Sequence, residues 1–421
     1  MKKMIYDRLT GRETSLAVIG LGYVGVPVAL RFARCFDVVG YDMDARRIEK
    51  LREKCGAGCG SIRFTSLEEE LSRAAFYIVT VLTPVDERKN PDLTCLVEAT
   101  RTVARYLKRG DYVVYESTVY PGCTEEVCVP LLEKGSGLKL GADFKVGYSP
   151  ERINPNDSEH TFSNTAKIVS ANDGQALDEV ARVYAEVVAA DLCRASGIRV
   201  AEAAKMTENV QRSVNIALMN ELQRLFSRMG IDMGEVIDMA SSKWNFVKYR
   251  PGLGGGHCIP VDPLYLVSAA SKLGVEMPVT SSGCAVNDGM AAYVVRSLLG
   301  AMGSDGRGAR ALLMGVTYKE NIDDIRNSRI AEMVGLLERE GMSVDVTDPH
   351  ADPDKVYAMY GIRPVPALRP PYDLIVVAVA HDDYRGLDDA YFRSISRGAA
   401  LLGDIRGLYK GRIKSLGYWS L

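Results

Sequence analysis

The sequence predicts an α/β protein with two open parallel sheets joined by a long helix, on the strength of three observations. A glycine-rich turn between two short apolar runs lies near the N-terminus. A helical pattern runs from Val200 to about Met229, and a second series of apolar runs and helical patterns follows residue 308. Because 421 residues exceed one ordinary hydrophobic core, we expect three domains, at 1–199, 200–302 and 303–421.

The composition argues against several classes of protein. Hydrophobic residues make up 47% and charged residues 25%, as in ordinary globular proteins. A net charge of -2 gives no reason to expect nucleic acid or an anionic membrane as a partner. The first residues lack the apolar stretch of a signal peptide, and no apolar run approaches the ~18 residues of a membrane span. We therefore expect a cytoplasmic protein.

The cysteines predict neither a disulfide framework nor a metal centre. Nine is an odd number, and the spacing matches no framework, which favours reduced thiols. Cys55 and Cys59 are close in sequence, but no second pair follows them and the chain has only four histidines. We therefore expect no zinc or other metal.

The first predicted strand leads into a turn that is typical of dinucleotide binding. The apolar run Leu16–Ile19 enters Gly20-Leu-Gly22-Tyr23-Val24-Gly25, and a helical pattern follows. Glycines at this spacing allow a tight turn and let the backbone approach a pyrophosphate at the helix N-terminus. The alternative is a glycine turn in an unrelated α/β unit.

An aspartate after the second apolar run predicts which dinucleotide is bound. Asp42 follows the run 36–40 and stands 20 residues beyond Gly22. Its carboxylate would accept hydrogen bonds from the ribose hydroxyls and repel a 2′-phosphate, so NAD is favoured over NADP. Arg46 and Arg47 follow closely and weaken this preference, and we count Arg47 as a further cofactor contact.

Polar segments follow three further predicted strands, at 75–82, 112–115 and 145–148. The segments are Thr83-Pro84, Glu116-Ser-Thr118 and Ser149-Pro-Glu151-Arg152. Ligands of open parallel sheets bind beyond the carboxyl ends of the strands, so these segments should converge at the nicotinamide end of the cofactor. Each segment also suits an ordinary turn, because Ser, Thr and Pro are turn formers.

The central helix places two polar residues on one face. Lys205 and Asn209 are four residues apart, so both lie on one side of the helix. Such a pair is usually solvated surface, and it gains interest only if the thiol-bearing loop described next packs over it. A helix of this length between two α/β halves commonly forms a dimer surface, and we expect a homodimer.

A glycine-rich loop places a thiol where a ligand can approach the backbone. The loop reads Tyr249-Arg250-Pro-Gly-Leu-Gly254-Gly255-Gly-His-Cys258, and Asp262 follows four residues later. Glycines permit sharp bends, and bare N–H groups bind anionic oxygens. Cys258 is therefore a candidate nucleophile, with Asp262 placed to orient a proton or a water. The alternative is a small buried cysteine after a tight turn.

The C-terminal part of the chain predicts a second, smaller sheet after the glycine-rich boundary 301–308. Apolar runs at 311–316, 343–346, 374–379 and 401–404 surround a helical pattern at 330–337. The turn after the first run reads Gly315-Val-Thr-Tyr-Lys319-Glu instead of the dinucleotide pattern. This turn suits a nucleotide other than the redox cofactor.

Motifs at six sites, in order along the chain, resemble those of the nucleotide-sugar 6-dehydrogenases, the family of UDP-glucose dehydrogenase. The branch that oxidises UDP-N-acetylhexosamines is the most similar. The resemblance implies an N-terminal Rossmann-like NAD domain, a helical centre that dimerises and a C-terminal UDP-sugar domain. The matching stretches are Gly20–Gly25, Glu116–Gly122, Ser149–Pro155, Lys205–Asn209, Gly254–Asp262 and Gly315–Arg326.

The resemblance also implies a reaction: four-electron oxidation at C6 of the sugar, with two NAD⁺ reduced and Cys258 forming a thiohemiacetal and then a thioester. Lys205, Asn209 and Asp262 would surround the C6 oxygen, and Glu151 and Thr118 would serve thioester hydrolysis and water placement. Arg326, Thr83 and Pro84 would contact the cofactor. The residues assigned to the substrate, beyond those named for the reaction, are Arg152, Arg250, Gly254, Gly255, Lys319 and Arg406.

Departures from the UDP-glucose branch favour a UDP-2-acetamido sugar. That branch has Phe-Pro-Lys-Asp after the cysteine, whereas Val261 stands here in place of the lysine. Arg152 and Pro155 replace a phenylalanine and a second glutamate. Loss of two charged groups should favour an acetamido methyl by ~1–3 kcal/mol. We expect UDP-N-acetylglucosamine first, the galacto epimer second and the manno epimer third, unless positions 155 and 261 do not face C2.

Two other functions fit parts of the chain. A two-electron 3-hydroxyacid dehydrogenase would share the cofactor domain and a lysine on a central helix, but it needs neither Cys258 nor a second nucleotide domain. A non-catalytic nucleotide-sugar-binding protein would need neither Cys258 nor Lys205. The number of NADH molecules formed per sugar distinguishes the three functions: two, one or none.

Overall fold

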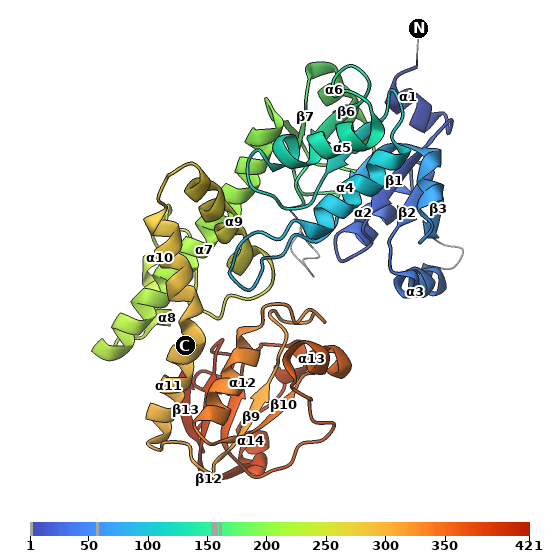
Figure 1. Ribbon diagram of the computed structural model, residues 1–421. Helices are drawn as coiled ribbons and strands as arrows, with labels where there is room; N and C mark the ends of the chain where they lie inside the picture. Colours follow the sequence, from blue (N-terminus) through green and yellow to red (C-terminus); the bar gives the residue numbers. More distant parts are fainter. Residues whose placement is uncertain (1–2, 56–58, 153–158, 160–161) are drawn as a thin grey trace. The chain divides into compact units, whose positions relative to one another are not determined.

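A computed structural model of the chain describes residues 3–55, 59–152, 159 and 162–421. It divides into two compact units (Figure 1). The first contains Met1–Glu208 and Leu264–Val275, and the second contains Asn209–Pro263 and Glu276–Leu421. The chain passes between the units three times: within α7 (Ile198–Met229), within α9 (Cys258–Lys272), and between Val275 and Glu276.

The described residues of the first unit form an eight-stranded sheet in the order β3-β2-β1-β4-β5-β6-β7-β8. β7 runs antiparallel to β6, whereas β1 to β6 pair in parallel. The strand order reverses between β1 and β4, where ligands of such sheets bind. The strands are β1 (Ser15–Ile19), β2 (Val38–Tyr41), β3 (Ile62–Thr65), β4 (Ala74–Val79), β5 (Tyr112–Tyr115), β6 (Lys145–Tyr148), β7 (Lys167–Ala171) and β8 (Leu192–Arg194).

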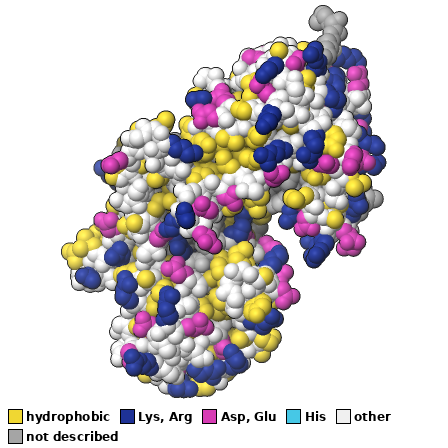
Figure 2. Space-filling view, viewed as in Figure 1, with side chains coloured by type: hydrophobic (Ala, Val, Ile, Leu, Met, Phe, Trp, Pro, Cys, Tyr) yellow, Lys and Arg dark blue, Asp and Glu magenta, His cyan; other side chains and the backbone are white. Residues whose placement is uncertain are grey.

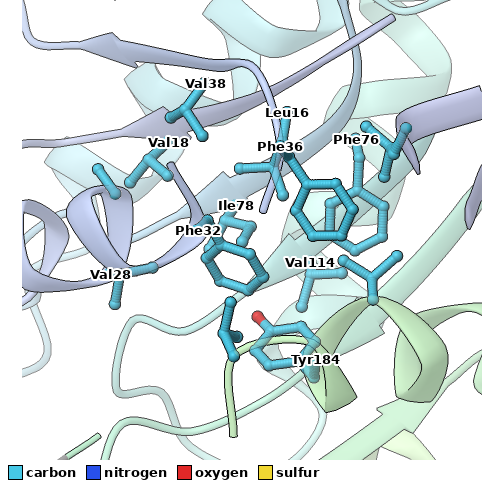
Figure 3. Close-up of a cluster of buried hydrophobic side chains, with 14 of the residues drawn as sticks. Leu16, Val18, Val28, Phe32, Phe36, Val38, Phe76, Ile78, Val114 and Tyr184 are labelled. Carbon is cyan, nitrogen blue, oxygen red and sulfur yellow. The ribbon is translucent and has the colours of Figure 1, made fainter. Parts of the chain in front are cut away.

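Helices cover both faces of this sheet. Phe76 and Ile78 of β4 join the buried cluster under α2 and α6, which Figure 3 shows together with Phe32 and Tyr184. Tyr77, between them in sequence, points the other way, and its hydroxyl donates to the carbonyl oxygen of Tyr106 at 3.2 Å. The helices are α1 (Ile5–Thr10), α2 (Gly25–Phe32), α3 (Ala45–Cys55), η2 (Glu68–Arg73), α4 (Thr94–Tyr106), η3 (Thr124–Cys128), α5 (Val129–Ser136) and α6 (Gly174–Ala185).

The described residues of the second unit form a parallel five-stranded sheet in the order β10-β9-β11-β12-β13. Alternate residues of β9 face opposite sides: Ala311 and Leu313 join one buried cluster, and Leu312 and Met314 join another. This alternation is expected of a sheet that is covered on both faces. The strands are β9 (Arg310–Met314), β10 (Ser343–Thr347), β11 (Tyr372–Val377), β12 (Ser396–Asp404) and β13 (Gly417–Ser420).

The remaining helices of the second unit pack around this sheet and along α7. A buried amide, Asn287, donates to the Ser213 carbonyl at 3.0 Å and accepts from Asn220 at 2.9 Å, which ties α10 to α7. Asn220 also accepts from the Gly252 N–H at 2.8 Å, so α7 holds the start of the glycine-rich loop. These helices are α8 (Met233–Ala240), α10 (Pro278–Asp288), α11 (Met290–Met302), α12 (Arg329–Arg339), α13 (Pro353–Tyr360), η4 (Asp382–Tyr384) and α14 (Asp389–Ile395).

The predicted fold class is confirmed, with two corrections of detail. β3, β7, β8 and β13 were not predicted, because each is a short strand that contains polar or charged residues among the apolar ones. The expectation of reduced thiols is wrong for Cys55 and Cys59, which form a disulfide where the end of α3 brings their Cα atoms to 5.6 Å. Among the described residues, no helix is long and apolar enough to cross a membrane.

Candidate active site

The three glycines after β1 are required for different reasons. Gly20 has φ +91°, and a Cβ there would lie 2.7 Å from a Val81 methyl. A Cβ on Gly25 would lie 1.9 Å from the Gly20 carbonyl oxygen, so the start of α2 packs directly on the turn. A Cβ on Gly22 would meet nothing within 4 Å. The backbone at Gly22 is therefore open to a ligand, as a pyrophosphate site requires. Tyr23 is exposed, and Val24 precedes the first residue of α2.

Asp42 is fixed at the end of β2 beside this turn. Its carboxylate is buried and accepts hydrogen bonds from the Leu21 N–H at 2.8 Å and the Asp44 N–H at 2.9 Å. The Arg47 guanidinium donates to the same carboxylate at 2.7 Å. Arg47 therefore lies at the group that was predicted to bind the ribose, and it offsets part of the charge that would repel a 2′-phosphate.

The polar segments predicted to meet the nicotinamide follow β4, β5 and β6, which are parallel neighbours in the sheet. Thr83 is buried, and the Pro84 carbonyl accepts from the Tyr265 hydroxyl of α9 at 2.9 Å. Thr118 is half-buried after β5, and Glu151 follows β6. The ends of these strands lie along one edge of the first sheet, as predicted.

A buried ion cluster surrounds Glu151. The Lys167 ammonium lies 3.1 Å from Glu116 and 3.7 Å from Glu151, and the Tyr184 hydroxyl donates to Glu116 at 2.5 Å. The Lys205 ammonium donates to the Glu151 carbonyl oxygen at 2.6 Å. Burial raises the pKa of the Glu116 carboxyl, although the Lys167 charge opposes this. Lys167 reaches this edge because β7 runs antiparallel to β6. The sequence signal for this contact is a lysine that opens a short apolar run.

Arg152, predicted to contact the substrate, is engaged within the first unit. Its guanidinium forms an ion pair with Glu208 at 2.8 Å and donates to the Ala166 carbonyl at 2.7 Å. These contacts fix Arg152 between α7 and the start of β7. A substrate contact would have to use the remaining donors of the guanidinium or displace Glu208.

Glu202 joins the start of α7 to the segment after Thr118. Its buried carboxylate accepts from the backbone N–H groups of Gly122 at 2.6 Å and Thr124 at 3.0 Å. Burial raises its pKa from 4.5 to about 7. The folded state therefore binds this proton more tightly than the unfolded chain does, and the stability it contributes is complete below pH 4.5 and is lost as the pH rises to 7.

We expect this group to lower the free energy of unfolding by about 3 kcal/mol between pH 4.5 and pH 7, from the difference between the two pKa values. Thermal unfolding of the wild type and of Glu202→Gln across this range measures the effect, and the variant should show the smaller fall. Glu125→Gln, which alters a more exposed glutamate of the same segment, is the control and should keep the wild-type slope. Equal slopes in the wild type and Glu202→Gln would contradict the prediction.

In the second unit, a buried pair accompanies the thiol. The Asn209 amide donates to the Asp262 carboxylate at 2.5 Å, and both side chains are almost fully buried. Cys258 is half-buried and opens α9, and Asp262 lies one turn further along the same helix. A helix N-terminus stabilises a thiolate, which is the reactive form of cysteine.

The segment after β9 clamps the glycine-rich loop. The Gly256 N–H donates to the Arg326 carbonyl at 3.0 Å, and the Asn327 amide donates to the Gly256 carbonyl at 2.8 Å. A Cβ on Gly255 would lie 2.8 Å from the Tyr318 Cβ, and a Cβ on Gly256 would lie 2.7 Å from the Tyr318 ring. The contacts of Tyr318 and Asn327 with the loop were not predicted, because both residues act on glycines that are distant in sequence.

Arg326, whose carbonyl takes part in this clamp, has a guanidinium that interacts with Asp324 and with the Cys258 thiol. Burial acts to lower the pKa of its guanidinium, but the ion pair with Asp324, at 2.5 Å, outweighs burial and the pKa is raised. The Cys258 thiol adds to the increase.

The second unit also contains a cavity of about 300 Å³ at the carboxyl edge of its sheet. Arg250 and Arg406, both predicted to contact the substrate, line it together, and Arg385 adds a third guanidinium. Lys319 is half-buried and precedes the lining residue Glu320. An excess of cationic groups suits a phosphate-bearing ligand. The other lining residues are Gly234, Ile237, Pro251, Ala380, Ile405, Leu408 and Leu421.

Three sequence profiles of one family match the chain in order. The NAD binding domain of the UDP-glucose/GDP-mannose dehydrogenase family matches residues 14–188, its central domain matches 199–289, and its UDP binding domain matches 312–411. A UDP-N-acetyl-D-glucosamine 6-dehydrogenase of Pseudomonas aeruginosa is 44% identical over 411 residues, which cover 94% of this chain and 97% of that protein. The enzyme of the same name from Salmonella typhi is 43% identical and covers 94% and 96%.

Solved structures of similar proteins share the fold. A UDP-D-ManNAc dehydrogenase from Pyrococcus horikoshii superposes with a TM-score of 0.87 at 28% identity, covering 96% of this chain and 98% of that one. A UDP-glucose dehydrogenase from Pyrobaculum islandicum superposes with a TM-score of 0.83 at 29% identity, covering 96% and 97%.

Proposed function

Because the chain belongs to the UDP-glucose/GDP-mannose dehydrogenase family and is an NAD-dependent dehydrogenase, we propose that it oxidises C6 of a UDP-N-acetylhexosamine to the carboxylate, with UDP-N-acetylglucosamine the preferred substrate. The observation that carries the proposal is 44% identity, over 94% of the chain, to an enzyme named for that reaction. The thiol at the start of α9, beside the Asn209–Asp262 pair, supports it.

The residues supply the steps as follows. Two NAD⁺ molecules, bound in turn at the first unit's glycine turn, would supply the hydride acceptor, one for each oxidation. In the first, Asp262 with a water accepts the hydroxyl proton and C6 becomes an aldehyde. The Cys258 sulfur then bonds to C6, and Lys205 and Asn209 stabilise the oxyanion of the thiohemiacetal by ~3–4 kcal/mol per donor. Loss of the second hydride leaves a thioester.

Hydrolysis completes the oxidation. Water adds to the thioester carbon, the C–S bond breaks, and the uronic acid leaves with the thiol restored. Glu151, held by Lys167 and Lys205, is the group we assign to proton transfer from this water, and Thr118 is assigned to its placement. For each sugar, one water is consumed and two NADH are formed.

The cavity of the second unit supports the nucleotide part of the proposal. We assign Arg250, Lys319 and Arg406 to the diphosphate and sugar, with the backbone of Gly254 and Gly255. The family profile that covers residues 312–411 is its UDP binding domain. Guanidinium groups bind phosphate oxygens with two parallel hydrogen bonds, which a single ammonium cannot do.

The preferred sugar is tested by NADH release over a panel of UDP-sugars. Val261 is buried in the first turn of α9, and Pro155 lies outside the described residues. We expect kcat/KM to be higher for UDP-N-acetylglucosamine than for UDP-glucose by roughly 5–150-fold, with two NADH per sugar. Faster oxidation of UDP-glucose than of every UDP-N-acetylhexosamine would refute the substrate, and one NADH per sugar would refute the four-electron reaction.

We also propose that the protein acts as a homodimer through the face of α7 and its neighbours. Figure 2 shows hydrophobic side chains at the surface among charged ones, and several large apolar residues of this region are exposed. Large apolar side chains exposed on one region of a protein are typical of interfaces. Sedimentation equilibrium should give twice the chain mass, and a monomer at micromolar concentration would contradict this. The exposed residues are Leu218, Leu225, Met229, Ile231, Met239, Trp244 and Val279.

A further inference from the structure

We propose that His381 is a positioning residue for nucleotide binding: it holds the turn that carries Lys319 and Glu320. The proposal rests on the proposed function, because it assumes that the cavity beside this turn takes the UDP moiety. His381 lies outside the sequence motifs, and no role was predicted for it from the sequence. All of the residues involved belong to the second unit.

His381 is fully buried between the turn and the end of β10. Its Nδ1 accepts the backbone N–H of Asn321 at 2.9 Å. Its Nε2 lies 3.2 Å from the Thr317 hydroxyl and 3.3 Å from the Asp348 carboxylate. Because Nδ1 accepts a hydrogen bond, the imidazole proton must be on Nε2, where both oxygens can receive it.

Asp348 fixes this arrangement. Its buried carboxylate also accepts the backbone N–H groups of Val316 at 2.7 Å and Thr317 at 3.1 Å. Burial acts to raise the pKa of Asp348, but the hydrogen bonds from His381 and the backbone outweigh it, and the pKa is lowered. A permanent anion at this point keeps the imidazole proton on Nε2 and leaves Nδ1 free to accept.

The turn is attached at both ends. The Thr317 hydroxyl donates to the Lys319 carbonyl at 2.9 Å, and His381 accepts from Asn321 two residues later. Asn321 has φ +60°, a left-handed conformation that a residue other than glycine adopts only when its surroundings hold it. Its amide also exchanges two hydrogen bonds of 2.9 Å with Asp382, the residue after the histidine.

The same turn forms part of the cavity wall. Glu320 lies between the two attachment points, and Ala380 directly precedes His381, and both line the cavity with Arg406. Loss of the hydrogen bond to Asn321 would therefore move the cavity wall and the Lys319 side chain together. The residues of this network belong to the second unit, whereas the cofactor turn belongs to the first, so we expect the effect on the UDP-sugar rather than on NAD.

Two substitutions separate positioning from bulk stability. The side-chain oxygen of an asparagine at position 381 reaches about as far as Nδ1 and can still accept the backbone N–H of Asn321. The amide of a glutamine reaches toward the position of Nε2 instead, so the backbone N–H of Asn321 loses its acceptor. We expect His381→Gln to raise the Kd for UDP and the KM for UDP-sugar about tenfold, with kcat and the KM for NAD within about twofold. His381→Asn should stay within about threefold of the wild type in all four quantities.

His350→Gln is the matched control, because the ring of this neighbouring histidine lies 4.7 Å from that of His381 but its side chain pairs with Asp383 at the surface. It should leave UDP binding unchanged. Thr317→Val removes the hydroxyl that holds the Lys319 carbonyl and nearly preserves shape, so it tests the same turn if His381→Gln fails to fold. We expect it to raise the Kd for UDP about fivefold.

Calorimetry with UDP and steady-state kinetics decide the outcome. Unchanged UDP binding in both His381→Gln and Thr317→Val would overturn the proposal, and so would equal weakening by His381→Asn and His381→Gln. A wild-type protein that neither binds UDP nor oxidises any UDP-sugar would overturn the proposed function instead. The two failures are therefore distinguishable.

Discussion

Replacement of Cys258 by serine should reduce sustained formation of the uronic acid at least ~10³-fold, while UDP-sugar and NAD still bind. A serine hydroxyl at its ordinary pKa is a far weaker nucleophile than a thiolate, and neither the N-terminus of α9 nor the Arg326 charge can ionise it. The substitution preserves size, so the Asn209–Asp262 pair beside it should keep its geometry.

The experiment measures uronic acid and NADH per sugar in the steady state, with UDP binding as the test of folding. Cys95→Ser, at an exposed cysteine in the first turn of α4, is the control and should keep full activity. Mass spectrometry of the wild type quenched during turnover should detect the sugar attached to Cys258. Near-normal production of uronic acid by Cys258→Ser would show that the covalent mechanism is wrong.

The sequence predicted those parts of the molecule that local patterns encode. The turn at Gly20, Gly22 and Gly25 was predicted because its glycines are required within a few residues of one another, and the geometry at each glycine explains its position. The strands ending before Thr118 and Glu151 were predicted because buried parallel strands are continuous apolar runs. The prediction that these strands end at the same edge of the sheet followed from the parallel topology alone.

The partners of those residues could not be predicted, because they come from distant segments. Lys167 meets Glu116 only because β7 runs antiparallel, and no spacing in the sequence encodes that direction. Tyr318 packs on Gly256 across 62 positions of sequence, and His381 holds Asn321 across 60. Such contacts depend on how helices and strands pack against one another, and local sequence patterns do not encode that packing.

The family is shown by the comparisons, but the roles of individual residues and the three domain boundaries stay predictions. The structure places Lys205 with Glu151 in the first unit, and Asn209 with Asp262 and Cys258 in the second. Each group is internally ordered by hydrogen bonds within its own unit. The chemistry assigned to them is therefore tested by substitution rather than by distance between the groups.

The contacts of Tyr318, Arg326 and Asn327 with the glycine-rich loop predict a large loss of activity when Gly256 is replaced. Gly256→Ala should lower kcat/KM roughly 10²-fold, because a nucleophile displaced by about 1 Å loses that much rate. The new methyl would lie 2.7–2.9 Å from three atoms of the Tyr318 ring, and the Tyr318 N–H donates to the Asp324 carbonyl at 3.1 Å, which holds the backbone that carries the ring. The loop must therefore move, and the bonds that Gly256 makes with Arg326 and Asn327 move with it.

Gly274→Ala separates this displacement from simple backbone strain. Gly274 has φ +70°, close to the +77° of Gly256, but a Cβ there would meet nothing within 4 Å. Both substitutions should therefore cost about 1–2 kcal/mol of stability from the left-handed backbone alone. Only Gly256→Ala should also lose activity, and a double variant with Tyr318→Ala should regain part of it by removing the ring that the methyl strikes. Equal kcat/KM in Gly256→Ala and Gly274→Ala would mean that the clamp does not position the thiol. Without any recovery in the double variant, the steric contact with Tyr318 would not be the cause of the loss.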